Sequence, residues 1–235
     1  MFAGPNGSGK TTVKLGLNRP PEWFGTYINP DDIERTMRET GSLPLSPFGL
    51  TTDADEVRRF FAASTFLRQR QPDFDAAAVD VVADAVTLRG VAVTSYHASV
   101  LADFLRRTAV ASARSFSFET VMSSRDKVDL LRDCRARGFR TYLYYVATED
   151  PAINVERVRL RVASGGHDVP EDRVVARYRR SLDLLPEAIR HADRAYLFDT
   201  SGREAWYFAE GTGGNHIELK SDEMPNWFRP VWNGI

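Results

Sequence analysis

The chain has 235 residues, 31 basic and 32 acidic side chains, a formal net charge of −1 and 43% apolar residues. This length suits one large α/β domain or two small ones, and it allows enough burial that no metal or disulfide is needed for stability. The single cysteine excludes an internal disulfide, and the balanced charge argues against a protein that grips nucleic acid through a global positive field.

The sequence lacks the apolar stretch of ~18 residues that a membrane-spanning helix needs. Only Met1, Phe2 and Ala3 precede Gly4, which leaves no room for the apolar part of a signal peptide. We therefore expect a soluble, cytoplasmic protein without a membrane partner. Arginine supplies 27 of the 31 basic residues, so a single arginine counts as functional only where its position supports that role.

Composition and apolar spacing divide the first half of the chain into five segments. They are a glycine-dense loop at 4–10, the start of a helix at 11–17, a strand at 25–29, a loop at 41–52 and a mainly helical stretch at 53–113. The strand should stop at Pro30, because proline cannot donate to a ladder. Within the helical stretch, Val79, Val82 and Val86 recur at helical spacing.

The second half alternates strands with helices. The expected elements are strands at 115–119, 140–147 and 195–199, helices at 125–137, at 152–163 and from Asp168, and a terminal hairpin at about 205–220. Residues 140–147 are apolar on both faces, as in a buried parallel strand. Asp168 is expected to cap its helix, since Pro170 suits the first turn and Glu171 follows three residues after the cap.

This order predicts an α/β fold in which a mostly parallel sheet is flanked by helices. We expect a single domain over 1–235 of the P-loop NTPase, kinase-like class. It would carry a helical insertion at about 41–113, a helical lid bearing arginines at about 152–182, and the hairpin at its carboxyl-terminal end.

The glycine-dense loop matches the pattern G-x-x-x-x-G-K-[ST] in full. Its residues are Gly4, Pro5, Asn6, Gly7, Ser8, Gly9, Lys10 and Thr11, and Thr12 follows. Glycines let successive backbone N–H groups face phosphate oxygens, Lys10 can reach the β- and γ-phosphates, and the Thr11 hydroxyl can ligate Mg²⁺. The alternative is a structural glycine-rich turn that precedes Lys10 and Thr11 by chance and binds no phosphate.

The loop departs from the usual pattern on its amino-terminal side. A phosphate loop normally follows a buried strand of ~5 residues, whereas three residues precede Gly4. Either the first strand is a stub, or Met1 is a truncated or misassigned start; we favour the second.

Several segments together resemble the zeta toxin family and its wider group of zeta-toxin-like P-loop small-molecule kinases. The similar segments are AGPNGSGKTT at 3–12, INPDDI at 28–33, SFSFETVMSS at 115–124, RVRLRVASGGHDVPEDRVVARYRRSL at 157–182 and LFDTSG at 197–202. The resemblance implies phosphorylation of a small molecule with ATP and Mg²⁺, with UDP-N-acetylglucosamine as the first acceptor to consider and an antitoxin protein as a partner. The helical stretch before Ser115 does not resemble the family. The identity of the substrate is therefore the property least safely carried over from the family to this chain.

Carboxylates and amides at strand ends are the candidate substrate-binding and catalytic groups. A kinase needs a carboxylate to receive the proton of the acceptor hydroxyl, and Asp31 resembles the family's general base. Asp32 is its competitor, and the alternative is that one of the two only caps the helix near Ile33. Asn29 is a further candidate for binding the substrate.

A second group of candidates follows the strand at 115–119. Glu119 could bind sugar hydroxyls or organise the waters of Mg²⁺, although a surface position at a strand end would also explain it. Thr120 and Ser123 are candidate substrate contacts, and a cap of the next helix is the other reading of the serine. Asp199 is predicted to be a turn residue or a neighbour of the nucleotide rather than a metal ligand.

Arginines cluster on two consecutive predicted helices. They are Arg157 and Arg161 on the first and Arg173, Arg177 and Arg180 on the second, with Gly165, Gly166 and His167 between them. This arrangement suits a lid that closes over ATP and spreads positive charge across the transferring phosphoryl group. The resemblance favours Arg161 and Arg177 first and then Arg157. A solvated helical face explains Arg159, Arg173 and Arg179 equally well.

The leading hypothesis is therefore an ATP- and Mg²⁺-dependent kinase of a small-molecule hydroxyl, with Asp31, Lys10 and the three arginines as its catalytic residues. A polynucleotide or RNA-end kinase is a second hypothesis, which the near-neutral charge disfavours. A third is a nucleotide-binding regulatory module with negligible turnover. Cys134 is expected to face the core and to be inert.

Overall fold

The computed structural model describes residues 1–165 and 168–232 and divides the chain into two compact units. The first unit comprises Met1–Arg19 and the described part of Glu119–Ile235, and the second comprises Pro20–Phe118. The second unit thus begins well before the insertion expected at 41–113.

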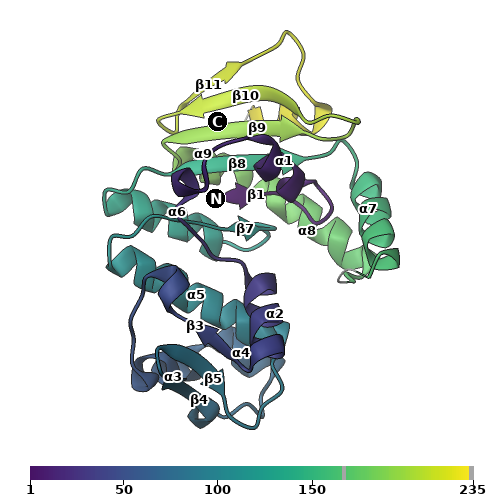
Figure 1. Cartoon of the computed structure of the whole chain (residues 1–235). Helices are drawn as coiled ribbons and strands as arrows, with labels where there is room; N and C mark the ends of the chain where they lie inside the picture. Colours follow the sequence, from purple (N-terminus) through teal and green to yellow (C-terminus); the bar gives the residue numbers. More distant parts are fainter. Residues whose placement is uncertain (166–167, 233–235) are drawn as a thin grey trace. The chain divides into compact units, whose positions relative to one another are not determined.

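The first unit is built on a six-stranded sheet with the order β11-β10-β9-β8-β1-β7 (Figure 1). Its strands are β1 (Phe2–Ala3), β7 (Glu119–Thr120), β8 (Tyr142–Ala147), β9 (Arg194–Asp199), β10 (Trp206–Thr212) and β11 (His216–Leu219). The four strands β7, β1, β8 and β9 run parallel to one another. Strands β10 and β11 extend the sheet beyond β9 in antiparallel pairing. The predicted α/β class with a mostly parallel sheet is confirmed.

Helices connect these strands and cover the sheet on both faces. They are α1 (Lys10–Gly16), α6 (Asp126–Ala136), α7 (Pro151–Ala163), α8 (Glu171–Asp183), α9 (Leu185–Arg190), the 3₁₀ helix η4 (Asn226–Phe228) and α10 (Arg229–Trp232). Val13 of α1 packs with Val146 of β8, and the hydroxyl of the adjacent Tyr145 meets Ser181 of α8 at 3.0 Å. Since neighbouring strand residues point to opposite faces, α1 and α8 lie on opposite sides of the sheet.

The second unit contains both helices and strands. Its elements are η1 (Pro21–Phe24), β2 (Thr26–Tyr27), α2 (Pro30–Thr40), β3 (Ser42–Pro44), η2 (Ser46–Phe48), α3 (Ala54–Ala63), α4 (Thr65–Arg70), η3 (Ala76–Ala78), β4 (Val79–Val82), β5 (Ala85–Leu88), α5 (Ser95–Ala111) and β6 (Phe116–Ser117). Strands β2 and β6 pair in parallel, and β3-β5-β4 form an antiparallel sheet. A buried apolar cluster that includes Ile33, Phe61 and Leu101 forms its core.

The helical reading of the valines near residue 80 is wrong, because β4 and β5 form a hairpin there. Ala83 and Asp84 have φ angles of 48° and 57°, which is the left-handed geometry of a two-residue hairpin turn. The turn reverses the chain between Val79 and Val86, both fully buried. Their helix-like spacing is therefore a coincidence, and the β-branched side chains favour strands.

Two further expectations are corrected. The strand predicted at 115–119 is two short strands in different sheets, β6 and β7, separated at Phe118. Asp168 does not cap a helix, because α8 begins at Glu171 with Pro170 as its N-cap and without a side-chain cap. Among the described residues, no helix is long and apolar enough to cross a membrane.

Candidate functional site

The glycine-dense loop lies at the carboxyl edge of the parallel strands, between β1 and α1. Its glycines allow a backbone that no other residue could adopt there. Gly4 has a φ of 143°, and a Cβ on it would lie 1.9 Å from the carbonyl oxygen of Val146. Gly7 has a φ of 73°, and its Cβ would lie 2.6 Å from the carbonyl oxygen of Asn154. The loop is thus packed directly against the ends of β8 and α7, as ligand-binding loops of open α/β sheets are.

Lys10 contacts the loop that precedes it. Its ammonium group donates to the carbonyl oxygens of Gly4 and Pro5, each at 2.9 Å. The side chain therefore lies over the loop, where a lysine of this pattern meets phosphate oxygens. Ser8 is fully buried and its hydroxyl has no hydrogen-bond partner within the described residues.

Thr11 and Glu119 meet beside the loop. The Thr11 hydroxyl donates to Glu119 Oε2 at 3.0 Å, and Lys14 Nζ lies 3.1 Å from Glu119 Oε1. Strand β7 places Glu119 here because it pairs in parallel with β1. One hydroxyl and one carboxylate fit Mg²⁺, which takes one or two carboxylates and completes its shell with phosphates and water. No group of three or more His, Cys, Asp or Glu in the described residues could hold a metal by itself.

Thr120 and Ser123, the two further candidates near Glu119, have other surroundings. The carbonyl of Thr120 accepts from the backbone N–H of Gly4 at 3.2 Å, and its hydroxyl accepts from that of Met122 at 3.0 Å. Thr120 thus anchors the start of the loop. Ser123 is half-buried.

The structure brings two of the three favoured arginines to the loop. Arg157 of α7 donates to the carbonyl of Thr200 at 2.6 Å and approaches the carbonyl of Gly7 at 3.5 Å. Arg177 of α8 lies 3.5 Å from the side-chain oxygen of Asn6. Arg161 is exposed one turn beyond Arg157. Gly166 and His167, predicted for the loop between the helices, lie outside the described residues.

The candidates Asn29, Asp31 and Asp32 belong to the second unit. Asn29 is the N-cap of α2, and its side-chain oxygen accepts from the backbone N–H of Asp31 at 3.1 Å. The cap is therefore Asn29 and neither aspartate. Asp32 pairs with Arg35 at 2.6 Å, whereas the side chain of Asp31 is exposed.

Asp199 ends β9 as a turn residue. It is 6% exposed and accepts from the backbone N–H of Ser201 at 2.8 Å and from the indole of Trp227 at 2.8 Å. Asn154, Thr200 and Trp227 also hold this edge of the sheet together and were not predicted. The signal for Asn154 was a polar residue inside an apolar helical stripe, and that for Thr200 was a polar residue at a strand end. Trp227 carried no such signal.

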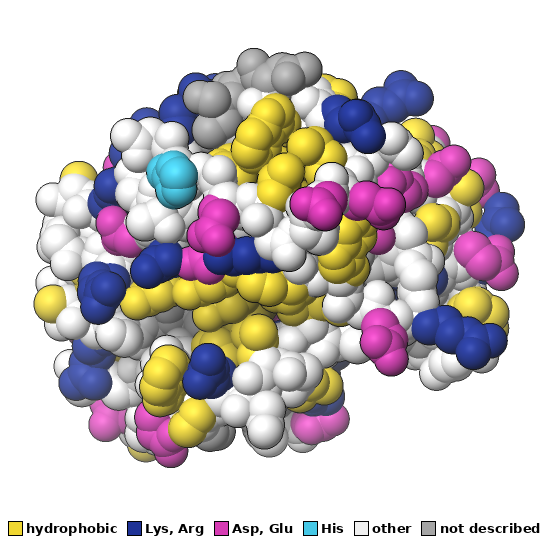
Figure 2. Space-filling view, turned by 90° about the horizontal axis from the view of Figure 1, so that it is seen from above, with side chains coloured by type: hydrophobic (Ala, Val, Ile, Leu, Met, Phe, Trp, Pro, Cys, Tyr) yellow, Lys and Arg dark blue, Asp and Glu magenta, His cyan; other side chains and the backbone are white. Residues whose placement is uncertain are grey.

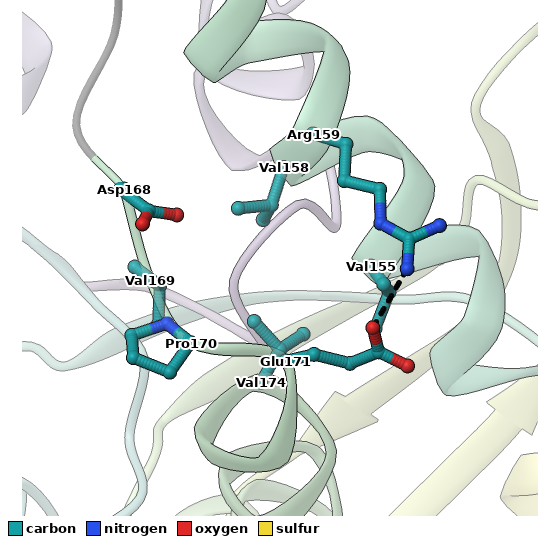
Figure 3. Close-up of a pocket in the computed structure, with 8 residues that line it drawn as sticks. All are labelled: Val155, Val158, Arg159, Asp168, Val169, Pro170, Glu171 and Val174. Carbon is teal, nitrogen blue, oxygen red and sulfur yellow. Dashed lines mark hydrogen bonds and ion pairs between the residues drawn. The ribbon is translucent and has the colours of Figure 1, made fainter.

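A small cavity of about 200 Å³ lies between α7 and α8 (Figure 3). Valines 155, 158, 169 and 174 supply its apolar wall, and Arg159 pairs with Glu171 at 2.7 Å across its mouth. No residue of the loop at 4–11 lines this cavity, so it is distinct from the loop.

Cys134 is buried, as expected. Burial raises the pKa of its thiol to about 11. A thiol that stays protonated at neutral pH is a poor nucleophile.

Comparison with known proteins identifies the fold. No family model matches the sequence. An uncharacterized protein of Haemophilus influenzae is 33% identical over 63 residues, which cover 27% of this chain and 45% of that protein. The chain thus spans less than half of that relative.

Solved structures cover nearly the whole chain. A chain of the complex of AvrRxo1-ORF1 with AvrRxo1-ORF2, crystallised with sulfate ions, has a TM-score of 0.52 and 15% identity, covering 94% of this chain and 60% of that one. The complex with ATP gives the same score over 93% of this chain and again 60% of that one. A chain of the PezAT toxin–antitoxin system of Streptococcus pneumoniae is 13% identical, with a TM-score of 0.46 over 98% of this chain and 75% of its own. The chain therefore shares its fold with a chain of the AvrRxo1 complex, in line with the predicted α/β class.

Proposed function

We propose that this chain is an ATP- and Mg²⁺-dependent phosphotransferase that phosphorylates a hydroxyl group of a small molecule. The loop from Gly4 to Thr11 carries this proposal. It lies at the carboxyl edge of a parallel sheet, Lys10 is folded over it, and the Thr11 hydroxyl meets a carboxylate beside it. The fold shared with a chain of the AvrRxo1-ORF1:AvrRxo1-ORF2 complex, which has been solved with ATP, supports the same function.

The roles of the residues follow from the charge that phosphoryl transfer must accommodate. The backbone N–H groups of the loop bind phosphate oxygens, and Lys10 exchanges the carbonyls of Gly4 and Pro5 for the β- and γ-phosphates. Thr11 and Glu119 hold Mg²⁺, which when bound offsets the negative charge of the phosphates. Arg157, Arg161 and Arg177 add positive charge from the lid.

Asp31 is the proposed general base. Its carboxylate takes the proton of the acceptor hydroxyl as that oxygen bonds to the γ-phosphorus, and the bond between that phosphorus and ADP breaks. The structure favours Asp31 over Asp32 because Asp32 is held in an ion pair with Arg35. Asn29 fixes the backbone of Asp31, and Asn29, Glu119, Thr120 and Ser123 remain the proposed substrate contacts.

UDP-N-acetylglucosamine is the first acceptor to test, and a neutralising antitoxin in the cytoplasm is the proposed protein partner. Two structures that contain a chain of similar fold are complexes of two proteins, AvrRxo1-ORF1 and AvrRxo1-ORF2. A polynucleotide substrate is disfavoured by the net charge of −1. On the face seen in Figure 2, basic side chains are interleaved with acidic ones.

The decisive experiment is mass spectrometry of a metabolite extract incubated with ATP and the protein. We expect one metabolite to gain a phosphoryl group with the wild type and none with Lys10→Ala. Asp31→Asn should retain ATP binding and lose acceptor-dependent ATP consumption, since the base contributes typically ~10²–10⁴-fold to the rate. Tight ATP binding with no phosphorylated product would instead identify a regulatory nucleotide-binding module.

A further inference from the structure

Every backbone carbonyl from Gly4 to Gly9 accepts a hydrogen bond. Lys10 Nζ donates to the carbonyls of Gly4 and Pro5, Asn154 Nδ2 to Asn6 at 2.6 Å, Arg157 Nη1 to Gly7 at 3.5 Å, the Thr200 hydroxyl to Ser8 at 2.8 Å, and the backbone N–H of Val13 to Gly9 at 3.0 Å. Three of these donors lie elsewhere in the chain: Asn154 and Arg157 are on α7, and Thr200 directly follows β9. They belong to no part of the phosphate-loop pattern.

The direction of each carbonyl determines the direction of the next amide. In a planar trans peptide the C=O bond and the following N–H bond point in opposite directions. A donor that holds the Asn6 carbonyl therefore orients the N–H of Gly7, and a donor that holds the Ser8 carbonyl orients the N–H of Gly9. The N–H of Gly7 is then turned away from Asn154, and the N–H of Gly9 is turned away from Thr200.

The two side chains that make the short contacts are themselves fixed. Asn154 is fully buried, and its side-chain oxygen accepts from the hydroxyl of Thr148, so its amide cannot rotate without losing a bond. The backbone N–H of Thr200 donates to Ala147 at 2.9 Å, and its carbonyl accepts from Arg157. Each residue thus links the loop to a neighbouring strand end.

We propose that Asn154 and Thr200 are positioning residues for the nucleotide: they hold the carbonyls of Asn6 and Ser8 so that the amides of Gly7 and Gly9 face the phosphates. This inference rests on the proposed function. It predicts that nucleotide affinity depends on two donors that never touch the nucleotide.

Thr200→Val tests the inference, because valine has nearly the shape of threonine and lacks the donor. We expect the Kd for MgADP and for MgATP, measured by titration calorimetry, to rise about tenfold, which corresponds to about 1.4 kcal/mol. Thr200→Ser keeps the hydroxyl and should stay within about threefold of the wild type. In turnover, the KM for ATP should rise in Thr200→Val while that for the acceptor stays unchanged.

Thr141→Val is the matched control. The Thr141 hydroxyl also donates to a carbonyl, that of His191 at 3.0 Å. Thr141 is buried and directly precedes β8, whereas the loop contacts the other end of that strand. We expect it to lower the melting temperature about as much as Thr200→Val while leaving the Kd unchanged.

The results separate this inference from the proposed function. A wild type that binds neither MgADP nor MgATP overturns both. A wild type that binds, together with a Thr200→Val variant of equal affinity, overturns only the positioning role. Equal weakening in Thr141→Val and Thr200→Val, or no rescue by serine, also overturns it, because general destabilisation would then explain the loss. Asn154→Asp, which places a carboxylate beside the Asn6 carbonyl, should weaken binding at least as much as Thr200→Val.

Discussion

Replacing Trp227 by phenylalanine should destabilise the first unit through a single lost hydrogen bond. The indole N–H donates to the buried carboxylate of Asp199 at 2.8 Å, and the indole ring also packs edge-on against Phe208 and Phe228. Phenylalanine keeps most of this packing and cannot donate. The carboxylate of Asp199 then retains only its two hydrogen bonds from Ser201, at 2.8 and 3.0 Å.

The size of the effect follows from the charge of the acceptor. A hydrogen bond to a charged group contributes ~1.5–3 kcal/mol, and its loss at a buried site falls in the same range. We expect a loss of about 2 kcal/mol in the free energy of unfolding. For a protein of this size that corresponds to a fall in melting temperature of roughly 4–8 °C.

The assay is urea denaturation of the wild type, Trp227→Phe, Asp199→Asn and the double variant, followed by circular dichroism. The cycle should give a coupling energy of about 1–2 kcal/mol between the two side chains. Trp206→Phe is the control, because Trp206 is half-buried and packs on Phe208, and the indole that donates to the Asp199 carboxylate is that of Trp227. A coupling energy near zero, or equal losses in both tryptophan variants, would refute the reasoning.

Three more outcomes follow from the structure. Glu119→Gln should weaken binding of MgATP about tenfold while changing that of metal-free ATP little, as measured by calorimetry with and without EDTA; equal changes would remove Glu119 from the metal site. Burial lowers the pKa of His97 below its usual 6.5. The unfolded chain therefore binds more protons than the folded one, and the free energy of unfolding should fall as the pH drops below 6.5. Urea midpoints at pH 7.5 and 5.5 should differ accordingly, and His97→Gln should reduce that difference. Cys134, with its pKa raised to about 11, should react with a thiol reagent at pH 8 about a hundredfold more slowly than in the urea-unfolded chain, and equal rates would mean that it is accessible.

Local patterns predicted the parts of the site whose chemistry is local. The spacing of Gly4, Gly9, Lys10 and Thr11 is set by the loop itself, so the sequence alone predicts its position before a helix. The parallel sheet was predictable for a similar reason, because apolar β-branched runs such as 140–147 alternate with amphipathic helices.

The donors that hold the loop were not predictable in this way. Asn154 is 148 residues from Asn6 in the chain, and Thr200 is 192 residues from Ser8. Only the pairing of β8 with β9 and the position of α7 bring these side chains to the loop. The β4–β5 hairpin was missed for the opposite reason, because a turn of Ala83 and Asp84 carries no glycine or asparagine to mark it.

The pairing of β2 with β6 has a consequence for how this chain can change. Thr26 lies opposite Phe116, close to the two points at which the second unit leaves and rejoins the rest of the sequence. A segment whose ends emerge side by side can be exchanged or shortened without rethreading the sheet that holds the loop. This segment carries the proposed base Asp31. The acceptor specificity can therefore change in evolution while the residues proposed to bind the nucleotide stay the same.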